Sequence, residues 1–344
     1  MGENNQIRRI CLIPNVSGVG GMVSFRDKLV KGLAERGIGV SYDLLDTPYE
    51  AVLVIGGTRD LAGLWRARRR GVRIVQRLDG MNWIHHRRRT GWRHYLRAEY
   101  GNLILSLIRS RLANLIIYQS DFSHQWWERV YGSNQIPWHV VRNGVDLERY
   151  TPEGMGNLPG DHFRILLVEG TIGGGYELGL QTAIQMGERL HSIYSHDVEV
   201  MVVGRVSESL QKEWKSKTEI SVNFSGQVFG ERIPEIDRSA HVLYAADLNP
   251  ACPNSVIEAL ACGLPVAGFD TGALSEIISE GSGQLVPYGG DPWKLEPPDI
   301  EGIAKAVNVI LGAQYSYRKA ARKRAEEAFG LDHMVEGYRN VLSI

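Results

Sequence analysis

The chain of 344 residues is 43% hydrophobic and 23% charged, which excludes a disordered chain and predicts two globular domains rather than one. Its formal net charge of zero hides an asymmetry, because residues 1–150 hold 23 Lys and Arg against 13 Asp and Glu, whereas residues 151–344 hold 16 against 26. Residues 59–97 contain 12 Arg and only two acidic residues, so one block carries the basic excess.

The cysteines and the apolar segments indicate the compartment. Cys11, Cys252 and Cys262 have the spacing of neither a zinc site nor a redox motif, which favours a reducing environment. The most apolar stretch, residues 102–118, is interrupted by two arginines, and no apolar run follows a basic start. We therefore expect a cytoplasmic protein with neither a signal peptide nor a membrane span.

Short apolar runs alternate with amphipathic stretches, which predicts an α/β fold with parallel sheets connected by helices. In the first half a helix is expected at 23–36, and strands are expected at residues 9–14, 52–55, 73–76, 115–118 and 138–141. In the second half strands are expected at residues 164–168, 198–203, 222–224, 242–245, 265–269 and 283–286. The two series predict two doubly wound, Rossmann-like domains that face an interdomain cleft, where ligands would bind at the carboxyl ends of strands.

The first predicted strand leads into a glycine-rich loop, residues 15–21, that precedes a helix. Gly20 and Gly21 would leave backbone N–H groups at the helix N-terminus, where an anion is favoured. The loop is not the dinucleotide fingerprint, because Val23 stands where the third glycine should be, and it lacks the Lys-Ser/Thr end of a P-loop. A phosphate site and a tight turn that needs glycine for its backbone both stay open.

The most informative segment is residues 247–270, in which a proline-containing loop precedes a predicted helix at 254–261. Backbone N–H groups of Asn254, Ser255 and Val256, at the start of this helix, could hold a phosphate. Glu258, one turn further along, could accept two hydrogen bonds from a ribose diol. The alternative is an ordinary acidic residue that interacts with the helix dipole.

The run Pro-Asn-Ser-Val-Ile-Glu-Ala-Leu-Ala-Cys-Gly-Leu-Pro-Val in this segment resembles the donor-nucleotide motif of glycosyltransferase family 4. The glycine pair of the first loop, the Asn-Gly-Val-Asp turn that begins at Asn143 and the closing segment 331–342 support the resemblance, which covers essentially the whole chain. It implies a GT-B fold and a retaining transferase with a nucleotide diphosphate sugar as co-substrate and no other cofactor. Glu258 would hold the ribose, and Asn143 would lie at the interdomain turn.

The resemblance also assigns the domains. Residues 1–150 would form an N-terminal acceptor-side domain, and residues 162–325 would form a C-terminal donor domain. The Pro- and Gly-rich residues 151–161 would link them. Residues 326–344 would form a last helix that packs back on the N-terminal domain.

The donor-sugar contacts depart from the family pattern. The first glutamate of the family's Glu-x7-Glu motif approaches the donor sugar, and its position is Pro250 in this chain. Asn249 and Asn254 are the polar residues that could take its place.

The diphosphate contacts depart further, since Thr171 and Tyr176 stand where the family has an arginine and a lysine. Two charge-assisted contacts are thereby lost. The diphosphate would be held by backbone N–H groups of Gly173 and Gly174, or by Arg205 from a neighbouring strand end. We favour these two together over the third alternative, a flexible loop in an inactive transferase.

The basic block interleaves arginine with tryptophan, tyrosine and histidine, which suits an anionic partner. We predict an acceptor or membrane-surface patch and regard nucleic acid as the less favoured partner; a solvated arginine-rich face is the alternative. Peripheral contact with an anionic membrane through residues 59–97 would place the protein at the inner membrane surface. The predicted patch residues are Arg87, Arg88, Arg89 and Trp92.

Asp79, just after the strand at 73–76, and His85 are the candidate catalytic residues, because both could lie near an acceptor hydroxyl. The family reaction needs little from a protein base, since the departing phosphate takes the acceptor proton. No His, Asp and Glu cluster has metal-ligand spacing, so no metal is expected.

The sequence therefore predicts a retaining glycosyltransferase that moves a sugar from a nucleotide diphosphate sugar to an anionic or lipid-linked acceptor in polysaccharide or glycoconjugate synthesis. Two alternatives stay open. A GT-B sugar-nucleotide epimerase would use the same nucleotide site but would need cleft carboxylates and histidines. A noncatalytic sugar-nucleotide or nucleic-acid binding protein would explain the missing glutamate, arginine and lysine.

Overall fold

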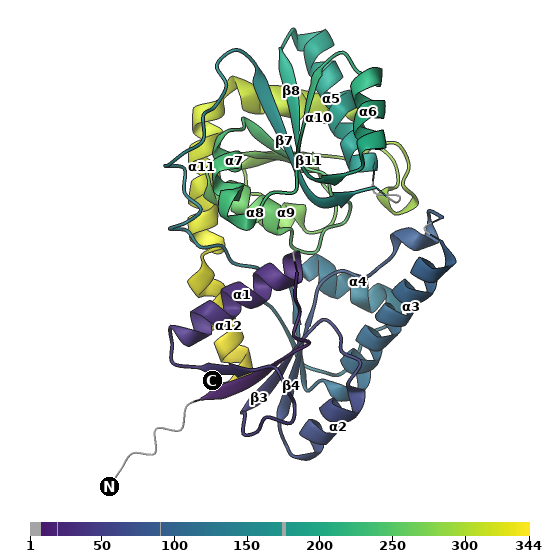
Figure 1. Ribbon diagram of the computed structural model, residues 1–344, viewed down its shortest axis with the longest axis vertical. Coiled ribbons are helices and arrows are strands. Elements are labelled where there is room, and N and C mark those ends of the chain that lie inside the picture. Colours follow the sequence, from purple (N-terminus) through teal and green to yellow (C-terminus); the bar gives the residue numbers. More distant parts are fainter. Residues whose placement is uncertain (1–7, 19, 90, 174–176) are drawn as a thin grey trace. The chain divides into compact units, whose positions relative to one another are not determined.

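The computed structural model describes residues 8–18, 20–89, 91–173 and 177–344, and the statements below concern these residues. The internal contacts divide the chain into two compact units (Figure 1). Unit 1 comprises Met1–His86, Gly91–Gly144 and Leu331–Ile344, and unit 2 comprises Arg87–Thr90 and Val145–Gly330. Within the described ranges, no helix is both long and apolar enough to cross a membrane.

Unit 1 is built around a six-stranded parallel sheet with the strand order β2-β1-β3-β4-β5-β6. Its strand β3 (Ala51–Ile55) is buried at every residue, as expected of an apolar strand that is covered on both faces. The other strands are β1 (Arg9–Ile13), β2 (Gly39–Ser41), β4 (Arg73–Leu78), β5 (Leu115–Tyr118) and β6 (Trp138–Val140). The helices are α1 (Gly21–Ala34), α2 (Leu61–Arg69), α3 (Trp92–Leu107), α4 (Asp121–Tyr131) and α12 (Leu331–Leu342), with the short turns η1 (Ile84–His86) and η2 (Ile108–Leu112).

The last helix, α12, packs against the first, α1, within this unit (Figure 1). The two helices approach closely at Gly32, where a Cβ atom would lie 2.4 Å from Val335 Cγ2. The ring centroids of Phe25 and Tyr338 are 5.1 Å apart, and both residues belong to the same apolar cluster as β1 and β3. The end of the chain thus completes the core of unit 1.

Unit 2 contains a second six-stranded parallel sheet, with the order β12-β11-β10-β7-β8-β9. Its strands are β7 (Phe163–Ile172), β8 (Val198–Val206), β9 (Ser221–Gly226), β10 (Val242–Ala245), β11 (Val266–Phe269) and β12 (Gly283–Val286). Its helices are α5 (Leu178–Tyr194), α6 (Glu208–Lys217), α7 (Ile233–Arg238), α8 (Asn254–Ala261), α9 (Leu274–Ile277), α10 (Ile300–Gly312) and α11 (Gln314–Ala328), with the turns η3 (Gly230–Arg232) and η4 (Pro292–Lys294).

The predicted class, two parallel α/β sheets, is confirmed, and two local expectations are wrong. The edge strand β2 was not predicted, because three residues that include a glycine carry little strand signal. Strand β7 was expected to end at Val168 but continues to Ile172, since its last residues pair with β8 after a register shift between Val168 and Thr171. The polar segment that follows Val168 is therefore strand rather than loop.

Candidate functional site

The strand order of unit 2 is sufficient to locate a candidate ligand site. From β7 the sheet continues to β8 and β9 on one side, while β10, β11 and β12 lie on the other. The order therefore reverses between β7 and β10. In open parallel sheets ligands bind outside the carboxyl ends of the strands at such a reversal. The residues that end these two strands, and those that follow β8 and β11 beside them, are the candidate site.

Each of the two strands at the reversal carries a carboxylate at this edge. Desolvation, followed by the charge of Asp247, raises the pKa of Glu169 to about 8, and desolvation raises the pKa of Asp247 to about 6. Close packing sets this environment, because Gly204 on β8 has a φ of +144° and a Cβ atom there would lie 2.0 Å from the Glu169 carbonyl oxygen. Sequence analysis missed both acids, although each closely follows a predicted strand.

The raised pKa of Glu169 makes stability depend on pH. Ionisation of this group costs folding free energy as pH rises from about 4, the value for an exposed Glu, through its folded-state pKa of about 8. Glu169→Gln should therefore match the wild type in stability near pH 5 and exceed it by about 1 kcal/mol near pH 8.5. Urea denaturation at both pH values measures this, with the exposed Glu280→Gln as the control. An equal stability difference at both pH values would contradict the assignment.

One of the two positions that lack the family's cations, Thr171, lies beside a different cation. Thr171 on β7 is paired in register with Arg205 on β8, and both residues are exposed. Arg205 Nη2 donates a hydrogen bond to Gln227 Oε1 at 3.0 Å. Gly173 follows β7 with a φ of +148°, and no described atom lies within 4 Å of a Cβ built there. Gly174 and Tyr176 lie outside the described residues.

Helix α8 presents one polar face. Asn254, Ser255 and Glu258 are half-buried, whereas the remaining side chains of the helix are buried. Val256 is 1% exposed, so only its backbone N–H group, and not its side chain, can contribute to a phosphate site. No side chain caps the first turn, which follows Pro253. The helix N-terminus and the Glu258 carboxylate thus lie along the same polar face, one turn apart.

Two buried polar groups next to this helix have no partner within the described part of the chain. Asn249, 5% exposed and with a φ of +57°, has an unpaired Nδ2, and buried Thr271 has an unpaired Oγ1. They follow β10 and β11, and Gly272 brings them together, because a Cβ atom there would lie 2.4 Å from the Pro250 nitrogen. Buried polar groups are nearly always hydrogen-bonded, so this pair suits a polar ligand. Thr271 was missed, although it closely follows a predicted strand.

The predicted glycine loop and interdomain turn belong to unit 1. Gly20 precedes α1 with a φ of +145° and Gly21 begins the helix, and no side chain caps this terminus either. Asn143 is buried, and its Oδ1 accepts a hydrogen bond from Arg77 Nη2 at 3.0 Å. Arg77 lies over the Phe25 ring at 3.9 Å, so one arginine of the basic block is part of the core. Asn143 therefore connects the segment after β6 to strand β4 through this hydrogen bond.

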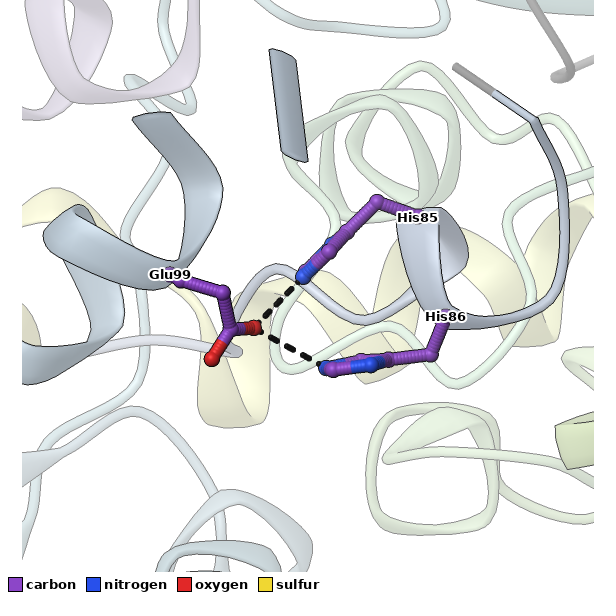
Figure 2. Close-up of side chains that lie close together, drawn as sticks. All are labelled: His85, His86 and Glu99. Carbon is purple, nitrogen blue, oxygen red and sulfur yellow. Dashed lines mark hydrogen bonds and ion pairs between the residues drawn. The ribbon is translucent and has the colours of Figure 1, made fainter. Parts of the chain in front are cut away.

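The two catalytic candidates have different surroundings. Asp79 lies half-buried at the carboxyl end of β4, and its carbonyl oxygen accepts a hydrogen bond from Trp127 Nε1 at 2.8 Å. His85 is buried in η1, and its Nε2 lies 2.7 Å from Glu99 Oε1 (Figure 2). The structure thus gives His85 a carboxylate partner that the sequence did not predict.

The predicted surface patch is divided between the units. Arg87 and Arg89 are exposed and Arg88 is half-buried, and this segment groups with unit 2. Trp92 begins α3 of unit 1 and is 69% exposed. Trp92 and the arginine run are therefore neighbours in the sequence, but they belong to different units.

Comparisons with known proteins give the family that part of the chain matches. Residues 164–312 match the family of glycosyl transferases group 1. Over 198 residues, 56% of the chain, it is 26% identical to a phosphatidyl-myo-inositol mannosyltransferase from Mycolicibacterium smegmatis, and the match spans about half of that protein's length, 47%.

Two solved structures have the same fold along nearly their whole length. Sucrose-phosphate synthase from Thermosynechococcus elongatus has a TM-score of 0.72 at 16% identity, with 98% of this chain and 99% of the other covered. Anabaena HepE, solved in complex with UDP and glucose, has a TM-score of 0.71 at 15% identity, with the same coverage. Residues 164–312 therefore match the glycosyl transferases group 1 family, and the chain as a whole has the GT-B fold.

Proposed function

We propose that the protein is a retaining glycosyltransferase that moves a sugar from a nucleotide diphosphate sugar to a lipid-linked or anionic acceptor in polysaccharide or glycoconjugate synthesis. The observation that carries the proposal is the polar face of α8. A helix N-terminus without a side-chain cap offers N–H donors to phosphate, and Glu258 one turn along offers two acceptors to a ribose diol.

The donor would be held by groups from four strand ends of unit 2. Arg205 would supply the positive charge that is missing at Thr171, and backbone N–H groups at Gly173 and Gly174 would bind the diphosphate. The unpaired Asn249 amide and Thr271 hydroxyl would hydrogen-bond the sugar in place of the glutamate that Pro250 replaces. A glucosyl or similar donor fits this set, because neutral sugar hydroxyls pair with neutral amide and hydroxyl groups.

In the reaction, the bond between the anomeric carbon and the diphosphate oxygen breaks, and the acceptor oxygen bonds to that carbon from the same face. The acceptor hydroxyl proton passes to the departing diphosphate. Donors fixed on the diphosphate stabilise the charge that develops there, which is the largest contribution that the protein can make. Asp79 would orient the acceptor hydroxyl from the carboxyl end of β4, and our assignment of His85 to catalysis stays a prediction.

The surface of α3 supports the proposed lipid-linked acceptor. Five of the large apolar residues exposed on this helix follow one another at spacings of four, four, three and four residues, which places them on one face: Trp92, Leu96, Tyr100, Leu103 and Leu107. Arg93 and Arg97 are exposed beside them. An apolar face flanked by arginine fits the surface of an anionic membrane. The name of the mycobacterial relative also indicates a lipid acceptor.

The test of the donor is a melting-temperature panel with UDP-, GDP-, ADP- and TDP-sugars. We expect at least one to stabilise the full chain. Arg205→Gln should weaken that donor about tenfold or more, because a charge-assisted phosphate bond contributes about 1.5–3 kcal/mol, and Arg205→Lys should recover part of the loss. The control is Lys212→Gln, another exposed cation of unit 2. Stabilisation by none of the nucleotides would overturn the proposed function, and an unchanged affinity in Arg205→Gln would overturn the role of Arg205.

A further inference from the structure

A cluster of metal-ligating side chains lies in unit 1. His85 and His86 end the turn η1, and Glu99 lies in the middle of α3. One ligand atom from each of the three residues lies within 4.8 Å of the others. Figure 2 shows both imidazole rings directed at the Glu99 carboxylate. Their Nε2 atoms lie 2.7 Å and 3.0 Å from the same oxygen, Oε1.

The histidine rings are held in this orientation by packing. The His85 side chain is only 1% exposed, and its ring centroid lies 4.2 Å from that of His86. Tyr95, one turn before Glu99 on α3, contacts both rings edge-on, at 5.0 Å and 5.7 Å between centroids. A site whose ligands are already oriented loses less conformational entropy when it binds an ion.

The free nitrogen of His85 is compatible with ligation through Nε2. His85 Nδ1 is buried and has no hydrogen-bond partner within the described residues. At 2.7 Å from Glu99 Oε1, Nε2 donates its proton to the carboxylate, so a cation at Nε2 would displace that proton and the neutral ring would then carry its proton on Nδ1.

We propose that His85, His86 and Glu99 bind a divalent transition-metal ion, with Zn²⁺ as the best fit. Two imidazoles and one carboxylate form a known zinc ligand set with an open fourth position, whereas Mg²⁺ and Ca²⁺ prefer oxygen ligands. Tetrahedral zinc with bonds of about 2.0–2.2 Å separates its ligands by roughly 3.3–3.6 Å. The two contacts would open by roughly 0.3–0.9 Å to reach this separation.

The ion would tie η1 to α3. The segment between these two elements carries Arg87, Arg88 and Arg89, so the metal would close a short loop around the arginine run. The fourth position would be open to water, because the side chains of His86 and Glu99 are 49% and 42% exposed. This proposal does not use the donor site, and it assigns His85 to a metal ion rather than to catalysis.

Isothermal titration of ZnCl₂ into the tag-free, chelator-treated full chain tests the site. We expect one ion per chain with a micromolar or tighter Kd, a higher melting temperature with Zn²⁺, and a visible Co²⁺ spectrum of the four-coordinate type. His86→Ala and Glu99→Gln, both at half-exposed positions, should each weaken binding about tenfold or more. His94→Ala is the matched control, because it removes a neighbouring histidine outside the cluster.

Two outcomes would overturn the proposal. One is the absence of Zn²⁺ binding at about 100 μM, a concentration at which a three-ligand site is filled. The other is Zn²⁺ binding that is unchanged in Glu99→Gln and His86→Ala. Circular dichroism of each chelator-treated variant separates loss of the site from loss of the fold.

Discussion

Replacing Glu258 with Ala is expected to weaken nucleotide binding about a hundredfold or more. The reason is that Glu258 would accept hydrogen bonds from both ribose hydroxyls, and bonds to a charged group contribute about 1.5–3 kcal/mol each. The half-buried position of the carboxylate on α8 keeps these bonds only partly exposed to water. Isothermal titration with the nucleoside diphosphate of the preferred donor measures the change.

The control for this variant is Glu213→Gln, which removes an exposed carboxylate of α6 in the same unit. Its affinity for the nucleotide should equal that of the wild type. The melting temperatures of the unliganded variants must also be compared, because the charge of Glu258 acts on buried Tyr150 and Asp237 and its removal changes the local electrostatics.

A thermodynamic cycle that combines the Glu258→Ala variant with deoxyribose analogues tests whether Glu258 binds the ribose. The wild type should bind a 2′,3′-dideoxy nucleotide about as weakly as Glu258→Ala binds the natural one. The variant should show little further loss with the analogue, because the interaction is already absent. If the wild type and Glu258→Ala lost the same affinity with the analogue, the ribose would bind elsewhere.

The polar face of α8 could be predicted from the sequence because its determinants are local. The prolines before Asn254, the apolar spacing and Gly263 fix where the helix begins and ends, and the predicted bounds agree with the structure. Which side chains share the polar face follows from the helical period alone. Val256 was expected to offer only its backbone N–H group, and its side chain lies in the core.

The other site residues depend on contacts between distant segments. Glu169 was expected in a loop but lies in β7, because pairing with β8 extends the strand beyond its apolar residues. The loops that carry Asn249 and Thr271 approach closely because Gly272 has no Cβ atom. Local pattern carries no information on such contacts, and so sequence reasoning found Asn249 through its motif and missed Thr271.

The histidine cluster illustrates the same limit. His86 and Glu99 are thirteen residues apart in the sequence, which is not the spacing of a ligand pair on one helix. The three residues meet because η1 folds against α3. The sequence therefore led to the expectation of no metal, whereas the structure supplies the ligand set that a metal site requires.

The exposed face of α3 is expected to be needed for membrane binding. The sequence drew attention to the arginines and Trp92, but Leu96 and Leu103 complete the apolar face, and Leu103 is 61% exposed. Inserting a leucine side chain into the interface gains about 1–2 kcal/mol, and each arginine near an anionic surface adds about 1 kcal/mol. The double variant Leu96→Asp, Leu103→Asp should therefore lose at least about tenfold in affinity for vesicles that contain phosphatidylglycerol.

Vesicle flotation with and without the anionic lipid separates the two contributions. Wild-type binding should fall when phosphatidylcholine replaces phosphatidylglycerol, and Arg93→Gln with Arg97→Gln should reduce that dependence on lipid charge. Val309→Asp is the matched control, because Val309 is a large apolar residue, 45% exposed, on α10 of unit 2. Donor binding should be unchanged in all of these variants, since α3 lies in the other unit. If the double aspartate variant floats as well as the wild type, α3 is not the membrane contact, and the arginine-rich block becomes a solvated surface.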